Sequence, residues 1–161
     1  EYANSLLGKE IRVKDLFAGG SIVDVTAVTK GKGFAGAVKR FGVKIQLNWH
    51  KHRKGHRVVA SISPSKPHMM FTVPRPGKMG FHQRTEYNKL ILKVGENPAE
   101  INVSGGYLHY GLVKGDHLII EGTLPGPTKR LIRFKAPVRA KKATIEPPKL
   151  MAVNLASKQG V

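Results

Sequence analysis

The sequence predicts a mainly β protein whose single domain is interrupted by a long basic insertion. Short alternations of apolar and polar residues, bounded by turn-forming residues, occur near both ends of the chain and are typical of strands. Between residues 30 and 89 no helical or strand period is sustained, while Gly and Pro recur. A length of 161 residues suits one domain, and 40% hydrophobic residues allow a modest core. We therefore expect a β domain at residues 1–29 and 90–140, an extended arm at 30–89 and a basic C-terminal tail at 141–161.

Two apolar alternations precede the arm, at residues 11–13 and 22–27. Gly19 and Gly20 lie between them and favour a turn. Because each alternation places its apolar residues on one side of an extended chain, we predict two strands. The second of these ends in a Gly-Lys-rich segment, where the glycines allow a close approach of the backbone to a partner.

The β pattern returns after the arm. Further strands are predicted at residues 90–94, 101–103, 118–120 and 131–134, with a turn at residues 95–98. The Pro125-Gly126-Pro127 sequence predicts a tight connection that exposes Lys129 and Arg130.

Most of the net charge of the chain is concentrated in the arm. Residues 30–89 hold fourteen Lys and Arg against one acid, Glu86, which gives +13 of the total +18. Like charges at this density repel one another unless a polyanion lies between them. We therefore expect the arm to be ordered by a partner rather than by a core of its own.

Nucleic acid fits this charge distribution better than the other anionic partners do. An anionic membrane surface would require an amphipathic basic helix, but Gly and Pro interrupt every candidate helix in the arm. No apolar run approaches the roughly 20 residues of a spanning helix. The absence of cysteine means that the fold needs no disulfide, as in a reducing cytosol.

Single aromatic residues are interspersed among the cations of the arm. They are Phe34, Phe41, Trp49, Phe71, Phe81 and Tyr87. This mixture favours stacking on bases or wedging against folded RNA. The alternative, in which the rings form small clusters that hold the shape of the arm itself, stays open.

Catalysis and cofactor binding find little support in the sequence. His50, His52 and His56 have metal-ligand spacing, but Lys and Arg surround them and no Cys, Asp or Glu is near, so we predict neither a metal nor another cofactor. The nucleotide-binding glycine motifs are missing, and the ten acids are scattered rather than paired. We expect no enzyme and no small-molecule substrate. A metal-dependent enzyme acting on nucleic acid and a free-standing RNA-binding barrel are the alternatives.

Three stretches together carry a resemblance to a known family. They are TKGKGFAGAVKRFG at 29–42, PRPGKMGFHQRTEYNK at 74–89 and GGYLHYGLVKGDHLIIEGTLPGPTKRLIRF at 105–134. In this order and spacing they resemble ribosomal protein L three of the large subunit, in its archaeal and eukaryotic form. The resemblance runs from about Gly8 to Gly160.

The resemblance implies a translation-protein-type β-barrel, partial here, formed by residues 1–29 and 90–140. It implies a noncatalytic, cytoplasmic ribosomal protein that binds the 3′ region of the large-subunit (23S-type) rRNA early in assembly, beside neighbouring ribosomal proteins. The arm would penetrate the rRNA, with its tip at residues 61–68 near the peptidyl transferase centre. Family members usually carry a tryptophan near this tip, where the present chain reads Pro64-Ser65-Lys66-Pro67. They are about twice as long, so the chain would correspond to a C-terminal half.

Charge, hydrogen-bonding capacity and the resemblance together select the side chains that we expect to contact rRNA. They are Lys30, Lys32, Lys39, Arg40, Lys44, Trp49, His50, Lys51, His52, Arg53, Lys54, Arg57, Lys66, Arg75, Lys78, His82, Gln83, Arg84, Lys129 and Arg130.

Overall fold

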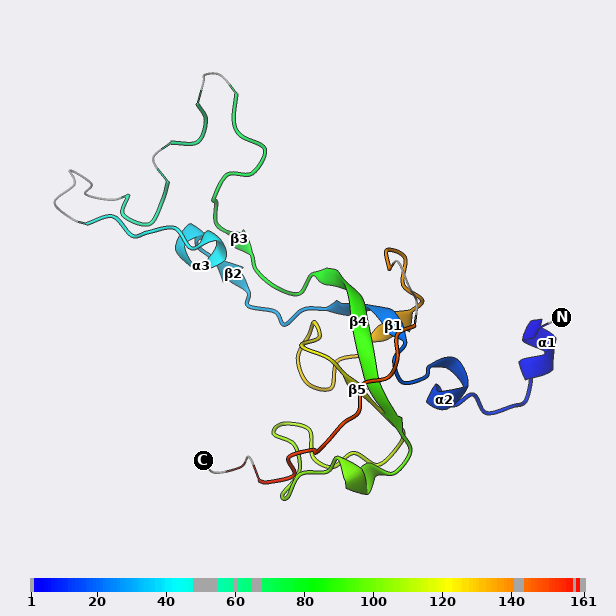
Figure 1. The fold of residues 1–161 in the computed structure, drawn as a ribbon. Coiled ribbons are helices and arrows are strands. Elements are labelled where there is room, and N and C mark those ends of the chain that lie inside the picture. Colours follow the sequence, from blue (N-terminus) through cyan, green and yellow to red (C-terminus); the bar gives the residue numbers. More distant parts are fainter. Residues whose placement is uncertain are drawn as a thin grey trace. The chain divides into compact units, whose positions relative to one another are not determined.

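The computed structural model describes residues 2–47, 55–59, 61–64, 68–140, 144–157 and 159. The chain separates into two compact units. The β unit comprises residues 1–28 and 83–161, and the arm unit comprises Thr29–His82. In Figure 1 the colours follow the chain from the β unit through the arm unit and back to the β unit.

The β unit contains an antiparallel sheet with the strand order β5-β4-β1-β6 in the part of the chain that the structure describes. β1 is Ile22–Val28, β4 is Gln83–Gly95, β5 is His117–Ile120 and β6 is Arg133–Lys135. Figure 1 shows the long β4 with β1 and β5 beside it. The mainly β prediction is confirmed. The described strands form no closed barrel, because β5 and β6 are the two edges of the sheet.

One face of this sheet carries the core. Val23 and Val25 of β1 and Ile91 of β4 are almost completely buried, as the apolar alternation in the sequence predicts. Phe17 and Phe134 pack against them with their ring centroids 6.2 Å apart and their planes at 71°, an edge-to-face arrangement. Burial of each aliphatic side chain stabilises the fold by about 1.5–3 kcal/mol.

The other face holds a buried carboxylate at a bulge. Val25 pairs with Glu86 and Val23 pairs with Lys89, so β4 has one residue more than β1 in this interval. Asp24 lies opposite the extra residue and is fully buried. Its Oδ1 accepts the N–H of Asn88, whose φ is 58°, and its Oδ2 accepts the N–H of Val138, both at 3.0 Å. The two hydrogen bonds offset the cost of burying the charge.

Two predicted strands are absent from the described structure. The segment predicted at 11–13 instead leads into a short helix, α2 (Val13–Leu16), because the backbone N–H of Arg12 donates to the Asp15 carboxylate at 2.9 Å and closes the first turn. Residues 101–103 follow a 3-10 helix, η1 (Pro98–Glu100), as a loop. Ile101 and Val103 are nevertheless buried, which accounts for their apolar character. A further helix, α1, spans Tyr2–Leu6.

The long strand β4 begins at Gln83, within the segment that the sequence places in the arm. Residues 83–86 pair with residues 25–28 of β1. Their side chains are polar because both faces of this end of the strand are partly exposed, so no apolar alternation marks them. These residues are part of β4 because their backbone pairs with β1, and not because of an apolar pattern in the sequence.

The arm unit has short regular elements near its two ends. β2 (Phe34–Ala35) pairs with β3 (Gly77–Lys78) in an antiparallel ladder. The helix α3 (Ala37–Phe41) follows β2 and ends at Gly42, whose φ of 68° suits a residue without a side chain. Ala35 and Ala37 are buried between these elements, and their small size suits a contact made mainly of backbone.

Replacing Asp24 with Asn should lower the free energy of unfolding by about 1–3 kcal/mol. The amide keeps one acceptor but turns an N–H donor toward either Asn88 or Val138, so one partly buried backbone N–H loses its partner. Urea denaturation monitored by circular dichroism measures the change. Asp116→Asn is the matched control because Asp116 is exposed, and it should stay within about 0.5 kcal/mol of the native chain. Equal destabilisation by the two substitutions would contradict this role for Asp24.

Candidate nucleic-acid interface

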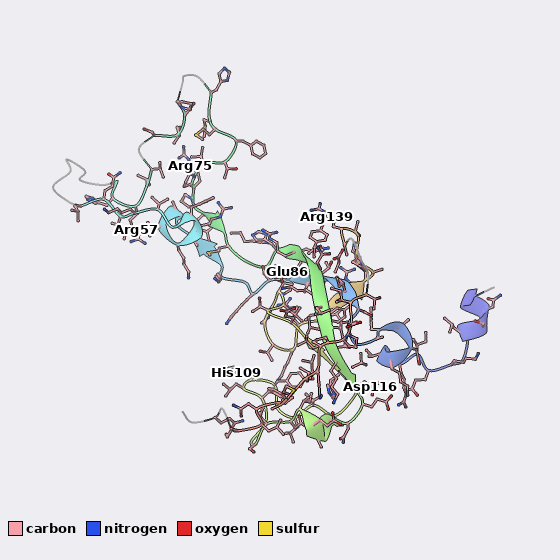
Figure 2. The ribbon with its side chains drawn as sticks, viewed as in Figure 1. Arg57, Arg75, Glu86, His109, Asp116 and Arg139 are labelled. Carbon is pink, nitrogen blue, oxygen red and sulfur yellow. The ribbon has the colours of Figure 1, made fainter. Side chains whose placement is uncertain are left out.

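The arm unit is positively charged throughout and holds no acid. Thr29–His82 contains no Asp and no Glu, so no Lys or Arg can find a carboxylate side chain within this unit. Most of its described cations are exposed: Lys30, Lys32, Lys39, Lys44, Arg57, Arg75 and Lys78. Figure 2 labels Arg57 and Arg75 in the arm. No side chain of the arm unit itself can neutralise these charges, which favours binding of an anion from outside the unit.

Backbone hydrogen bonds hold the base of the arm. The N–H of Thr29 donates to the His82 carbonyl at 2.9 Å, and the N–H of Lys32 donates to the Met79 carbonyl at 2.9 Å. Gly80 lies in the left-handed region with φ 71°, and a Cβ there would lie 2.0 Å from the Lys30 carbonyl oxygen. The glycine therefore permits a close approach of the two backbone segments at the base of the arm, residues 29–32 and 79–82. The exposed side chains of Lys30 and Lys32 project from this ordered base.

Arg40 is the cation most engaged within the arm. Its Nη1 donates to the Arg75 carbonyl at 3.0 Å, and its guanidinium lies 5.0 Å from the Phe41 ring centroid. The guanidinium also occupies the space beside Gly77, where a Cβ would approach it to 3.1 Å. Arg40 thus links α3 to the returning chain, a role additional to the predicted RNA contact.

The described aromatic residues of the arm unit divide into two groups. Phe34 and Phe71 are highly exposed, at 81% and 106% of their reference areas. Phe41 has the cation contact described above, and Phe81 lies 5.2 Å from Lys78 Nζ. The rings of Phe34 and Phe71 are available for stacking, whereas the rings of Phe41 and Phe81, although also exposed, each contact a basic side chain.

The remaining described residues of the predicted set lie at the end of the arm or in the β unit. His82 is half-buried and closes the base of the arm, while Gln83 and Arg84 are exposed at the start of β4. Lys129 is exposed in the tight connection, as expected, and has φ 68°. The N–H of Arg130 donates to the Pro127 carbonyl at 3.1 Å and closes this turn.

Seven predicted contacts lie outside the described residues. They are Trp49, His50, Lys51, His52, Arg53, Lys54 and Lys66. Within the described ranges, no three His, Asp or Glu side chains gather as metal ligands would. No helix in those ranges is long and apolar enough to cross a membrane.

Two surface ion pairs of the β unit shift pKa values. A hydrogen bond and charge attraction from Lys14 lower the pKa of Glu96, and Glu96 in turn raises the pKa of Lys14. The ammonium of Lys93 lowers the pKa of Glu100 in the same way. Such exposed pairs contribute little to the stability of the fold.

The sequence-based set omits several exposed cations of the β unit, among them Arg133, Lys135 and Arg139. Arg133 and Lys135 flank Phe134 on β6, and Arg139 follows four residues later. The alternation of charge around a partly buried Phe in residues 133–135 is the signal that could have identified the first two.

The fold and the charge define a class: an antiparallel β protein that carries an acid-free, cationic arm. The family model described as Ribosomal protein L3 matches residues 1–160. The chain therefore belongs to the ribosomal protein L3 family, in agreement with the resemblance carried by its three motifs.

Curated relatives agree with this assignment. A protein named large ribosomal subunit protein uL3 from Pyrobaculum islandicum is 58% identical over 142 residues, covering 88% of this chain and 42% of the relative. Proteins of the same name from Saccharolobus solfataricus and Methanocorpusculum labreanum are 48% and 47% identical, each covering 99% of this chain and 45% or 48% of the relative. The chain thus spans less than half the length of these relatives.

Replacing Gly80 with Ala should open the base of the arm. The new Cβ would collide with the Lys30 carbonyl, and a non-glycine residue at φ 71° is strained, so we expect a local cost of about 1–3 kcal/mol. Hydrogen exchange at the Lys32 and Met79 amides reports the opening as a loss of protection.

Gly36→Ala is the matched control for this substitution. Gly36 has φ −73° and open space around its Cα, so alanine fits there. Unchanged protection at Lys32 and Met79 in the Gly80 variant would contradict the close approach.

Proposed function

We propose that this chain is part of a structural, noncatalytic, cytoplasmic component of the large ribosomal subunit that binds large-subunit rRNA through its arm. The charge of the arm unit carries this proposal, because twelve Lys and Arg occur there without a single acid. The names of the relatives support it, since each is a large ribosomal subunit protein.

The chemistry of the arm suits folded RNA. Exposed lysines and arginines bind phosphates and release counterions. Closely spaced glycines let the backbone approach the RNA, and exposed rings such as Phe34 and Phe71 can stack on bases. The ladder of β2 with β3, together with α3, holds the outgoing and the returning segment of the arm beside each other.

The finer parts of the proposal rest on the family resemblance. The β unit binds the 3′ region of the large rRNA during early assembly, beside neighbouring ribosomal proteins. The arm extends toward the peptidyl transferase centre, with residues 61–68 at its tip. The predicted boundaries of the β domain, arm and tail stay part of this proposal.

Neutralising arm lysines should weaken RNA binding and its salt dependence. A protein with roughly 6 to 10 phosphate contacts loses about 10³ to 10⁵ in affinity between 50 and 200 mM salt. In the triple variant K30Q/K32Q/K39Q, the slope of log affinity against log salt should fall by about 3, one per contact removed. Titration of the purified chain with a fragment of large-subunit rRNA measures this.

The control for the arm variant removes three exposed lysines of the β unit, as K9Q/K114Q/K149Q. It lowers the net charge by the same amount as the arm variant does, and it should leave most of the slope of log affinity against log salt intact. Equal losses in the two triple variants would show that only net charge matters, and a native slope near zero would refute rRNA binding by the arm.

Metal content separates the proposal from the alternative of a metal-dependent enzyme acting on nucleic acid. We expect the purified chain to hold no stoichiometric transition metal, because the neighbouring cations oppose a dication at the histidines. Elemental analysis of the native chain and of His52→Ala and His56→Ala decides this. Stoichiometric metal that both substitutions abolish would favour the enzyme.

A further inference from the structure

We propose that Arg40 is a positioning residue of the arm. It fastens the helix α3 to the returning segment, residues 74–82, and so places the exposed lysines of the arm before RNA is bound. Arg40 acts through these neighbours rather than as a phosphate contact of its own. The inference rests on the proposed function and deepens it, since the partner is the same RNA. The order of the free arm is testable without RNA.

The backbone ladder at the base of the arm ends just before a Pro-Arg-Pro sequence in the returning segment. β2 pairs with β3, and the pair farther out along the arm is Ala35 with Gly77. Pro74 and Pro76 have no N–H, so they cannot donate the hydrogen bonds that would lengthen this ladder. A side-chain donor can hold the returning segment where the backbone donors end.

Arg40 supplies this donor from α3. Its Nη1 donates to the Arg75 carbonyl at 3.0 Å, and Figure 2 labels Arg75 near that helix. The guanidinium fills the space beside Gly77, where a Cβ would approach it to 3.1 Å. It also lies 5.0 Å from the centroid of the Phe41 ring. One planar group thus makes three contacts in fixed directions, which suits a guanidinium and not the compact charge of a lysine.

The partners of Arg40 leave its positive charge in place. The arm unit contains neither Asp nor Glu, so a carbonyl oxygen and an aromatic ring take the place that a carboxylate has in an ion pair. An ion pair would hold the two segments together but would cancel one positive charge of the arm. The contacts of Arg40 hold the segments and keep the full charge for an anionic partner.

Exposure separates Arg40 from the lysines on either side of it. Lys39 on α3 and Lys78 on β3 are exposed, whereas Arg40 is half-buried. Lys39 precedes Arg40, and Lys78 follows Gly77, against which the guanidinium lies. Fastening α3 to the returning segment therefore also fixes the backbones that carry these two lysines. Phosphates then meet cations that are already placed, and less conformational entropy is lost on binding.

Positioning and phosphate contact leave different signatures in binding data. Removing a phosphate contact reduces the number of released counterions, so the slope of log affinity against log salt becomes smaller. Opening the base of the free arm reduces the fraction of molecules that are ready to bind, and affinity falls by a similar factor at every salt concentration.

The variant R40K keeps the charge but removes the planar group. In the free chain, hydrogen exchange at the Met79 amide, which donates to the Gly33 carbonyl across the base, should become about tenfold faster. With a fragment of large-subunit rRNA as the probe, affinity should fall by about threefold to tenfold while the salt slope stays native. R40Q should show the same faster exchange and the same native slope.

Lys39 provides matched controls on the same helix. K39R should leave both exchange and affinity native, and K39Q should lower the salt slope by about 1 without changing exchange at Met79. Exchange at the Ile91 amide, which donates to the Ser21 carbonyl in the β unit, should stay native in every variant. That readout separates local opening of the arm from global unfolding.

Three outcomes would overturn the positioning role. Native exchange and affinity in R40K would show that only the charge of Arg40 matters. A salt slope that falls by about 1 in R40Q would make Arg40 a phosphate contact. Faster exchange in R40K with native RNA affinity would show that Arg40 stabilises the arm without preparing it for RNA.

Gly77→Ala tests the contact between Arg40 and the returning segment. The new Cβ would displace the guanidinium, so exchange at Met79 should be faster than in the native chain. In an R40A background that space is empty, and alanine at position 77 should leave the exchange unchanged or slow it. Equal effects of Gly77→Ala with and without the Arg40 side chain would contradict the contact.

The positioning role and the proposed function fail in distinguishable ways. A native chain that binds RNA with no salt dependence refutes rRNA binding by the arm, whatever the exchange rates are. A native slope that falls in K30Q/K32Q/K39Q, together with native exchange and affinity in R40K, leaves the arm as the RNA-binding element and overturns the positioning role alone.

Discussion

The antiparallel pairing of β1 with β4 is the constraint on which the rest of the structure depends. It places Val23, Val25 and Ile91 together in the core, and it joins the chain segments that precede and follow the arm. Closing a long loop costs little more than closing a short one, about 0.6 kcal/mol for each doubling of its length. A stable ladder can therefore hold the ends of a long arm that buries little apolar surface of its own.

The two units differ in how their residues are used: the β unit holds the core, and the arm unit holds most of the positive charge. The β unit has a core, ion pairs such as Lys14 with Glu96, and a buried carboxylate whose partners are all backbone. The arm unit has cations without acids and is ordered at its base by backbone hydrogen bonds. An acid placed in the arm would form ion pairs there and weaken its attraction for an anionic partner. Its composition is thus what electrostatic recognition requires.

The parts of the fold that the sequence predicts are those in which one segment shows a pattern of apolar or charged residues by itself. Apolar alternation identifies β1, a short apolar run identifies β5, and charge density identifies the arm. The first half of β4 is polar, so only its pairing with β1 reveals it. The segment at 11–13 shows the opposite error, since a two-residue alternation there is outweighed by the local hydrogen bond from Arg12 to Asp15.

The candidate interface also has parts that the sequence reveals and parts that only the structure reveals. The exposed lysines of the arm are visible in the sequence as a run of charge without acids. The bond from Arg40 to the Arg75 carbonyl joins positions 35 residues apart, and no local pattern encodes it. Thr26 and Arg133 likewise become neighbours only through strand pairing, which no local pattern encodes.

The two hydrogen bonds of Asp24 also impose an order on biosynthesis. Its partners lie 64 and 114 positions further along the chain. A ribosome makes the chain from its N-terminus, so this carboxylate stays hydrated until the last partner has emerged. The sheet around Asp24 therefore reaches its final form late, after the whole basic arm has already been exposed to whatever anions surround the nascent chain.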